Sequence, residues 1–62
     1  MSYAVDVAEK ILIEKMIAWA EEQEADERKL ARHLKDNGYS GEYATGKADA
    51  YKKVAQELCR KI

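Results

Sequence analysis

The sequence contains one motif with the spacing of a phosphate-binding loop. Residues 41–47 read Gly-Glu-Tyr-Ala-Thr-Gly-Lys, which satisfies G-x-x-x-x-G-K. A loop that hydrolyses nucleotides also needs a preceding strand, a serine or threonine directly after the lysine, and a distant acidic strand end. Here Ala48 follows Lys47, and no strand pattern precedes the motif. The motif therefore does not predict nucleotide hydrolysis.

The same segment has residue types that could bind a ligand without catalysing a reaction. Glycines near a helix start expose backbone N–H groups, and a nearby cation, hydroxyl and aromatic ring would help to hold an anion or a nucleotide phosphate. The predicted ligand-binding residues at this turn are Tyr39, Tyr43, Thr45, Gly46 and Lys47. The alternative is that the glycines serve only a tight turn.

His33 and Cys59 are the remaining residues whose types suit catalysis or metal binding. His33 is expected on the charged side of a helix, with no cysteine or acid placed to activate it, and Cys59 is expected to be a small buried hydrophobe. Zinc needs about four ligands, and the sequence has no C-x-x-C or H-x-x-x-H spacing. We therefore expect no catalytic residue, no metal, no cofactor and no enzymatic activity.

These residues must be positioned by helices, because the sequence has no proline and its three glycines all lie between positions 38 and 46. Apolar side chains recur at three- and four-residue spacing before that segment and predict a long helix over about 4–37, with Ser2 and Asp6 as candidate N-caps. The periodic positions are Val5, Ala8, Leu12, Met16, Trp19, Leu30 and Leu34. Asp36-Asn37-Gly38 predicts a Schellman cap at its end, with Tyr39 at C″.

A second helix is predicted over about 42–61, after a turn over about 38–41. Its apolar positions are Ala44, Ala48, Tyr51, Ala55, Leu58 and Ile62. Ser40 and Thr45 are alternative caps, and the earlier start is preferred because Ala44 already fits the apolar period. That start places Gly46 inside the helix, where it costs about 1 kcal/mol relative to alanine.

The two helices predict a single all-α domain over 1–62, an unequal antiparallel hairpin. At 1.5 Å per residue the first helix is about 50 Å long and the second about 30 Å, which leaves residues 3–15 uncovered. A chain of 62 residues has little core of its own. We therefore expect homo-oligomerisation, as a dimer or higher, to complete a helical bundle. The predicted oligomer interface is Ile11, Leu12, Ile13, Met16, Ile17 and Trp19.

Glu9 and Glu27 are exceptions on the apolar face of the first helix. Either the helix bends there, or these carboxylates face a polar partner across the oligomer, such as Lys47 or Arg28. A frayed or solvated position is the preferred interpretation. Elsewhere on the first helix, the basic side chains that follow its acidic run are interpreted as a solvated ion-pair face. They are Arg28, Lys29, Arg32 and Lys35.

Charge and hydropathy exclude several classes of partner. Eleven basic and twelve acidic side chains give a net charge of −1, which argues against nucleic acid as the default ligand. The longest apolar runs are far shorter than the roughly 20 residues of a membrane span. A single cysteine and the absence of a signal-peptide pattern predict a cytoplasmic protein.

The segment 43–54, Tyr-Ala-Thr-Gly-Lys-Ala-Asp-Ala-Tyr-Lys-Lys-Val, resembles short helical proteins of tailed bacteriophages in which a glycine precedes a D-A-Y helix. The resemblance covers roughly the last third of the chain. It implies a non-enzymatic antagonist of host defence in the host cytoplasm, which blocks a host protein or traps a nucleotide signal. The sequence is thus interpreted as an oligomeric binding protein that inhibits a host protein or sequesters a small nucleotide-like ligand. The alternative is a structural or assembly protein whose only partners are proteins.

Overall fold

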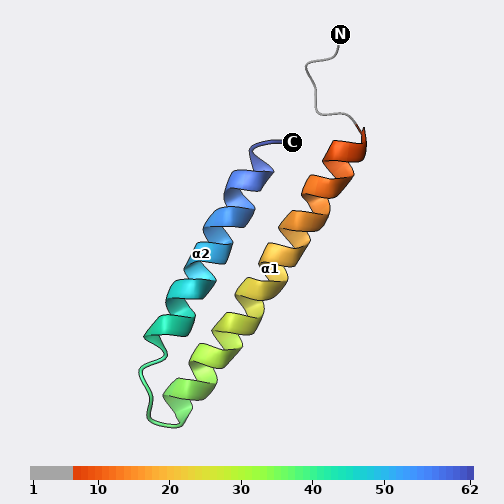
Figure 1. The fold of residues 1–62 in the computed structure, drawn as a ribbon. Helices are drawn as coiled ribbons and strands as arrows, with labels where there is room; N and C mark the ends of the chain where they lie inside the picture. The colour runs from red at the N-terminus through yellow and green to blue at the C-terminus, as the bar shows by residue number, and fades with distance from the viewer. Residues whose placement is uncertain (1–6) are drawn as a thin grey trace.

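The computed structural model describes residues 7–62, which form two helices packed side by side. Helix α1 spans Val7–Asp36 and helix α2 spans Glu42–Cys59, and residues 7–62 contain no strand. The helices run antiparallel and are joined by a short turn (Figure 1). The all-α hairpin predicted from the sequence is confirmed. The candidate caps Ser2 and Asp6, together with Val5, lie outside the described residues.

The end of α1 is a Schellman cap, as the Asp-Asn-Gly sequence predicts. Gly38 has a left-handed φ of 89°. The Tyr39 N–H donates to the Leu34 carbonyl at 2.8 Å, and the Gly38 N–H donates to the Lys35 carbonyl at 3.1 Å. These are the two hydrogen bonds that define the motif, and they satisfy carbonyls that the helix leaves unpaired.

Gly41 is the N-cap of α2 and lies directly against α1. Its φ is 69°, and a Cβ at this position would lie 2.8 Å from the Ala31 carbonyl oxygen. Only glycine allows this approach without strain. The Ser40 Oγ accepts a hydrogen bond from the Glu42 N–H at 3.4 Å, but Gly41 rather than Ser40 occupies the cap position. Helix α2 therefore has the earlier of its two possible starts, and Gly46 lies inside it.

The seam between the helices is built from alanine. The buried side chains are those of Ala20 and Ala31 from α1 with Ala44, Ala48 and Ala55 from α2. Among residues 7–62, no side chain larger than alanine is fully buried. Small side chains let two helices pack closely, but such a seam has no room for leucine, tryptophan or tyrosine. The large apolar side chains must therefore lie beside the seam.

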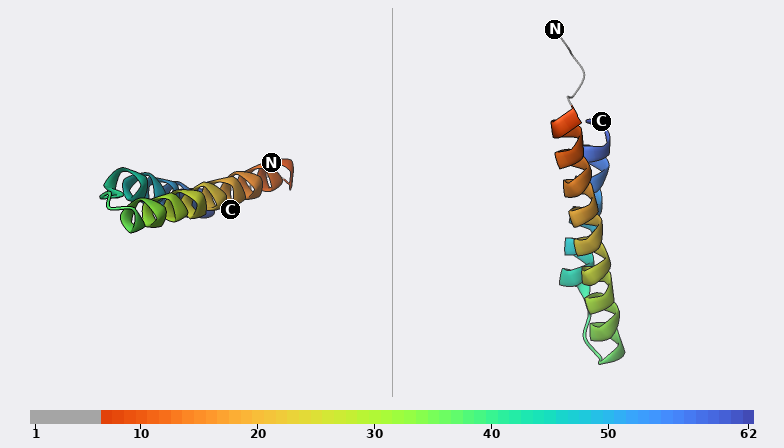
Figure 2. Two further views of the ribbon diagram at one scale, coloured as in Figure 1. Left: turned by 90° about the horizontal axis from the view of Figure 1, so that it is seen from below. Right: turned by 90° about the vertical axis from the view of Figure 1, so that its right-hand side faces the viewer.

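Helix α2 covers more of α1 than the predicted lengths of the two helices indicated. Because the turn is short, α2 begins beside Ala31 and runs alongside α1 toward its first turns (Figures 1 and 2). Ile13, expected to be uncovered, is half-buried, as is Ile17, whereas Ile11 and Leu12 are exposed. The expectation of an uncovered segment reaching residue 15 was therefore wrong at Ile13.

Candidate functional site

The seam divides the rest of the surface into two flanks of different chemistry. The apolar flank carries the large side chains Leu12, Met16, Trp19 and Leu30 from α1 and Tyr43, Tyr51 and Val54 from α2, with the polar residues Gln23, Asp26 and Lys47 among them. The polar flank consists of Glu21, Glu24, Arg28, Arg32 and Lys35 from α1 with Thr45, Asp49, Lys52 and Gln56 from α2. At 100° per residue each set falls on one side of the buried alanines. Contacts between the helices agree, since Trp19 meets Tyr51 and Arg28 meets Asp49.

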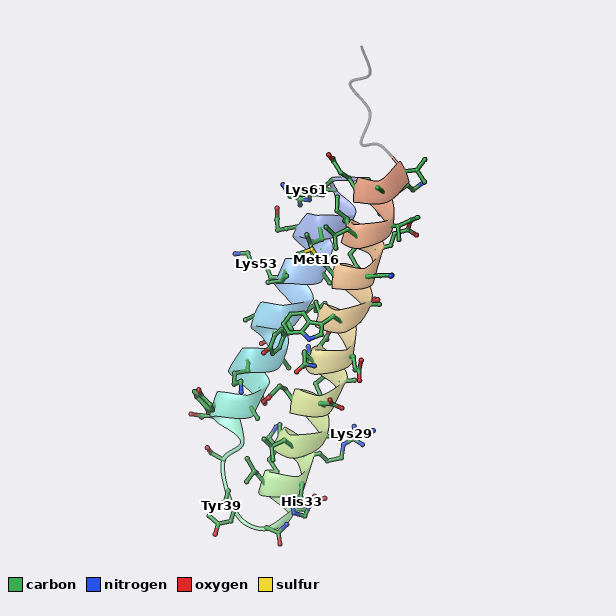
Figure 3. All side chains as sticks on the ribbon, turned by 45° about the vertical axis from the view of Figure 1, so that its right-hand side comes forward. Met16, Lys29, His33, Tyr39, Lys53 and Lys61 are labelled. Atoms are coloured by element: carbon green, nitrogen blue, oxygen red, sulfur yellow. The ribbon has the colours of Figure 1, made fainter. Side chains whose placement is uncertain are left out.

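The apolar flank exposes large side chains that the seam cannot take. The Trp19 and Tyr51 rings meet edge to face, with centroids 5.6 Å apart, a favourable aromatic geometry. Trp19 nevertheless remains 53% exposed, Leu12 58% and Tyr43 82%. Figure 3 shows Met16 on the same side, where α1 meets the end of α2.

The structure separates the six predicted interface residues. Leu12, Met16 and Trp19 lie on the apolar flank, and Ile13 and Ile17 are half-buried beside the seam. Ile11 lies nine residues before Ala20, which is two and a half turns, and so falls on the opposite side of α1 from the seam. Leu30, Tyr43 and Val54 extend the exposed apolar surface beyond the predicted set.

Glu27 is a nearly buried carboxylate paired with Lys47. The Lys47 Nζ lies 3.1 Å from Glu27 Oε1, and the Glu27 side chain is only 16% exposed. The other oxygen, Oε2, is buried without a hydrogen-bond partner. The preferred expectation of a frayed or solvated position is therefore wrong for Glu27. Its partner is Lys47, one of the two residues considered, reached within one chain rather than across an oligomer. Glu9 lies exposed in the first turn of α1.

The ion pair with Glu27 stabilises the charged form of Lys47. The hydrogen bond to Glu27, and then its negative charge, raise the pKa of Lys47 above the ordinary lysine value, against a smaller lowering by desolvation. Its Nζ also lies 5.5 Å from the centre of the Tyr43 ring, within cation–π range. Lys47 is therefore not a free cation at the turn.

The five predicted ligand-binding residues do not converge in one chain. Tyr43 and Lys47 lie on the apolar flank, whereas Thr45 lines depressions on the polar flank. Tyr39 projects from the turn (Figure 3). The Thr45 N–H donates to the Gly41 carbonyl at 3.0 Å, and Gly46 is inside α2. Backbone donors expected near Gly46 are thus engaged within the helix.

The polar flank holds a basic depression that the sequence analysis did not single out. It has a volume of about 270 Å³ and is lined by Arg28, Ala31, Arg32, Lys35 and Thr45. Arg28 pairs with Glu24 at 2.8 Å and with Asp49 at 3.2 Å, and these hydrogen bonds raise its pKa. Among residues 7–62, Arg32 and Lys35 form no ion pair. The interpretation as an ion-pair face therefore fits Arg28 but not Arg32 or Lys35.

Cys59 is exposed at the end of α2, so the prediction that it is buried was wrong. It falls on the polar flank, in an open groove of about 560 Å³ beside Glu21 and Gln56. His33 is exposed on α1, as expected. Within the described part of the chain, no three His, Cys, Asp or Glu residues gather as a metal site.

Comparison with known proteins gave no relative. No family model, curated protein or solved structure matches the chain. Neither α1 nor α2 is long and apolar enough to cross a membrane.

Proposed function

We propose that this protein is a non-enzymatic binding protein whose working form is a homo-oligomer joined through the apolar flank. The observation that carries the proposal is the mismatch between the seam and the flank. The seam buries only alanines, while Leu12, Trp19 and Tyr43 remain largely exposed. A hairpin that leaves its largest apolar side chains in water buries little of the area that stabilises a fold.

The exposed side chains of this flank are what a partner would have to cover. Each of them is at least 45% exposed, and they are Leu12, Met16, Trp19, Leu30, Tyr43 and Val54. Large apolar side chains gathered on one side of a small protein are typical of an interaction surface.

The proposed occupant of the apolar flank is a second copy of the same chain. A hairpin this small needs the additional core in order to fold, so the partner must be present whenever the protein is. Two hairpins that pack by their apolar flanks around a twofold axis form a four-helix bundle, with Trp19 and Tyr51 near the centre.

The proposed activity is capture of a partner without turnover, either a host protein that is thereby inhibited or a small nucleotide-like ligand that is sequestered. The supporting feature is that the described charged groups at the helix contacts form ion pairs, Glu27 with Lys47 and Arg28 with Asp49, rather than a nucleophile beside a base. A role as a structural protein is the second candidate, favoured by the same apolar flank. A phage origin would place the protein in the host cytoplasm.

The test compares two adjacent residues that lie about 100° apart around α1. Leu12→Glu places a charge on the apolar flank, and Ile11→Glu places the same charge on the side of α1 that faces away from the seam, at similar exposure. Leu30→Glu tests the flank nearer the turn. We expect Leu12→Glu and Leu30→Glu to lower the native mass or the helicity at a fixed protein concentration, measured by light scattering and circular dichroism. Ile11→Glu should leave both unchanged.

If all three variants formed the same oligomer as the wild type, the interface would lie elsewhere and the proposed surface would be refuted. Capture without turnover has a separate readout. Any small ligand that copurifies should be recovered chemically intact, and a hydrolysed ligand would instead indicate an enzyme.

A further inference from the structure

We propose that Arg32, Lys35 and Thr45 bind the phosphate group of a small ligand in the basic depression of the polar flank, with one site in each chain. The inference deepens the proposed function, on which it rests, by naming the ligand class and by moving the site away from Lys47.

The first support is uncompensated positive charge. Residues 28–35 contain Arg28, Lys29, Arg32 and Lys35 and no acid. Arg28 is neutralised by Glu24 and Asp49. Arg32 and Lys35 are three residues apart on one helix, where side chains are neighbours and like charges repel. An anion between these two cations removes that repulsion.

The second support is the composition of the depression. Ala31 leaves space beside α1, and the residues that line the depression include no carboxylate. The Arg32 guanidinium offers a planar fork of donors, Lys35 a compact charge, and Thr45 a hydroxyl from the other helix. Donors that come from two helices suit a tetrahedral phosphate, whose oxygens point in several directions.

The third support is the arrangement of acids around these cations. A neighbouring depression shares Lys35 and Thr45 but is also lined by Glu42 and Asp49. On the other side, Glu24 sits one turn before Arg28. A long nucleic acid would run from the cations into these carboxylates, whereas a single phosphate group would not. The ligand that fits is therefore a small phosphorylated molecule.

The site is compatible with the proposed oligomer. The depression lies on the flank opposite Trp19 and Tyr43, so association through the apolar flank leaves it open. Lys47 is the alternative cation near the turn, but Glu27 holds it at 3.1 Å.

The experiment is calorimetric titration with inorganic phosphate, adenosine monophosphate and pyrophosphate in low salt. Three proteins are compared: the wild type, the double variant Arg32→Gln with Lys35→Gln, and the double variant Lys53→Gln with Lys61→Gln. The last pair has the same charge change, but Lys53 points away from α1 on the exposed side of α2 (Figure 3) and Lys61 is exposed in the turn that follows α2. We expect the Arg32 and Lys35 changes to weaken binding at least about tenfold, because charge-assisted hydrogen bonds are lost, and the control to bind as the wild type does.

Thr45→Val and Thr45→Ser refine the test, since only the valine variant should weaken binding. Tighter binding of adenosine monophosphate than of inorganic phosphate would identify the ligand as a nucleotide, and equal binding would identify the phosphate alone as the recognised group. Native mass and helicity are recorded on each sample, so that loss of the oligomer is distinguished from loss of the site.

Two results would overturn the inference. If both double variants weaken binding equally, the protein attracts phosphate through its overall charge and not through a site at Arg32 and Lys35. If the wild type binds none of the three probes at millimolar concentration, Arg32 and Lys35 do not form this site. They would then serve chiefly to complement the C-terminal dipole of α1.

Discussion

At the residue scale, Glu27 is the most constrained polar group in the hairpin. Its side chain is 16% exposed, one oxygen pairs with Lys47, and the other has no hydrogen-bond partner. A carboxylate in this position loses much of its hydration and recovers only part of it through one ion pair. The two partners are unequal, because Lys47 is 41% exposed and can turn toward water.

This inequality predicts opposite effects of removing either partner. Glu27→Leu should leave the fold as stable as the wild type or about 1 kcal/mol more stable, because an incompletely paired buried charge is replaced by an apolar side chain. Lys47→Met should lower the urea midpoint, since it leaves the Glu27 carboxylate unpaired. Urea unfolding of the two variants at one protein concentration measures both effects. Equal destabilisation by both changes would mean that the pair itself stabilises the fold.

The raised pKa of Lys47 predicts a pH dependence at alkaline pH. A lysine whose folded-state pKa exceeds its unfolded-state value contributes stability that is complete below the unfolded value and is lost as pH rises through the folded value. The difference in unfolding free energy between the wild type and Lys47→Met should therefore be constant near neutral pH and shrink above 10.5. Arginine keeps its charge at this pH. The difference in unfolding free energy between Lys47→Arg and Lys47→Met should therefore persist above pH 10.5. A difference that grew with pH would contradict this assignment.

The sequence placed Glu27 on the apolar face of α1 but could not choose its partner. Periodicity within one helix shows which residues share a face. The meeting of Glu27 with Lys47 depends on the register between two helices. That register is set by the contact of Gly41 with the Ala31 carbonyl, which involves positive φ at two glycines of the turn.

At the element scale, the three glycines do different things and should respond differently to alanine. Gly41→Ala should destabilise the fold by about 2 kcal/mol or more, because it combines positive φ with a clash against backbone. Gly38→Ala should cost about 1 kcal/mol for positive φ alone, since its Cβ would meet nothing within 4 Å.

Gly46→Ala is the matched control and should stabilise the protein by up to about 1 kcal/mol, because it lies inside a helix with open space beside it. Thermal unfolding of the three variants tests the ranking. A Gly41→Ala protein as stable as Gly46→Ala would contradict the close approach of the turn to α1.

The alanine seam predicts intolerance of larger side chains. Ala48 is fully buried, and Ala50 on the same helix is exposed. Ala48→Leu should destabilise the hairpin by about 1–3 kcal/mol because the helices must separate. Ala50→Leu should change stability by less than about 0.5 kcal/mol, as is usual for a surface position. Urea unfolding measures both changes, and tolerance of leucine at Ala48 would show that the seam is not closely packed.

Several features of the elements followed from local sequence. Asp36-Asn37-Gly38 predicted the cap on α1 because a Schellman motif depends only on neighbouring residues. Cys59 was predicted to be buried and is exposed, because its burial depends on how α2 is rotated about its own axis against α1. The basic depression was missed for the same reason, since Thr45 meets Arg32 and Lys35 only after the helices pack.

At the scale of the whole molecule, the hairpin has two sides of different chemistry. The apolar flank exposes Trp19 and Tyr43 and is assigned to a second copy of the chain, while the polar flank carries the proposed phosphate site. Composition predicts association, because a short chain rich in alanine cannot enclose its larger side chains. Association stays a prediction, and composition could not predict which face would take part in it.

The native mass of the wild-type protein, measured by light scattering at micromolar concentration, shows whether the hairpin folds alone or as an oligomer. We expect a folded, helical species of at least twice 7.1 kDa, because a single hairpin buries only alanine side chains and leaves its apolar flank in water. A cooperatively folded species of 7.1 kDa would contradict it.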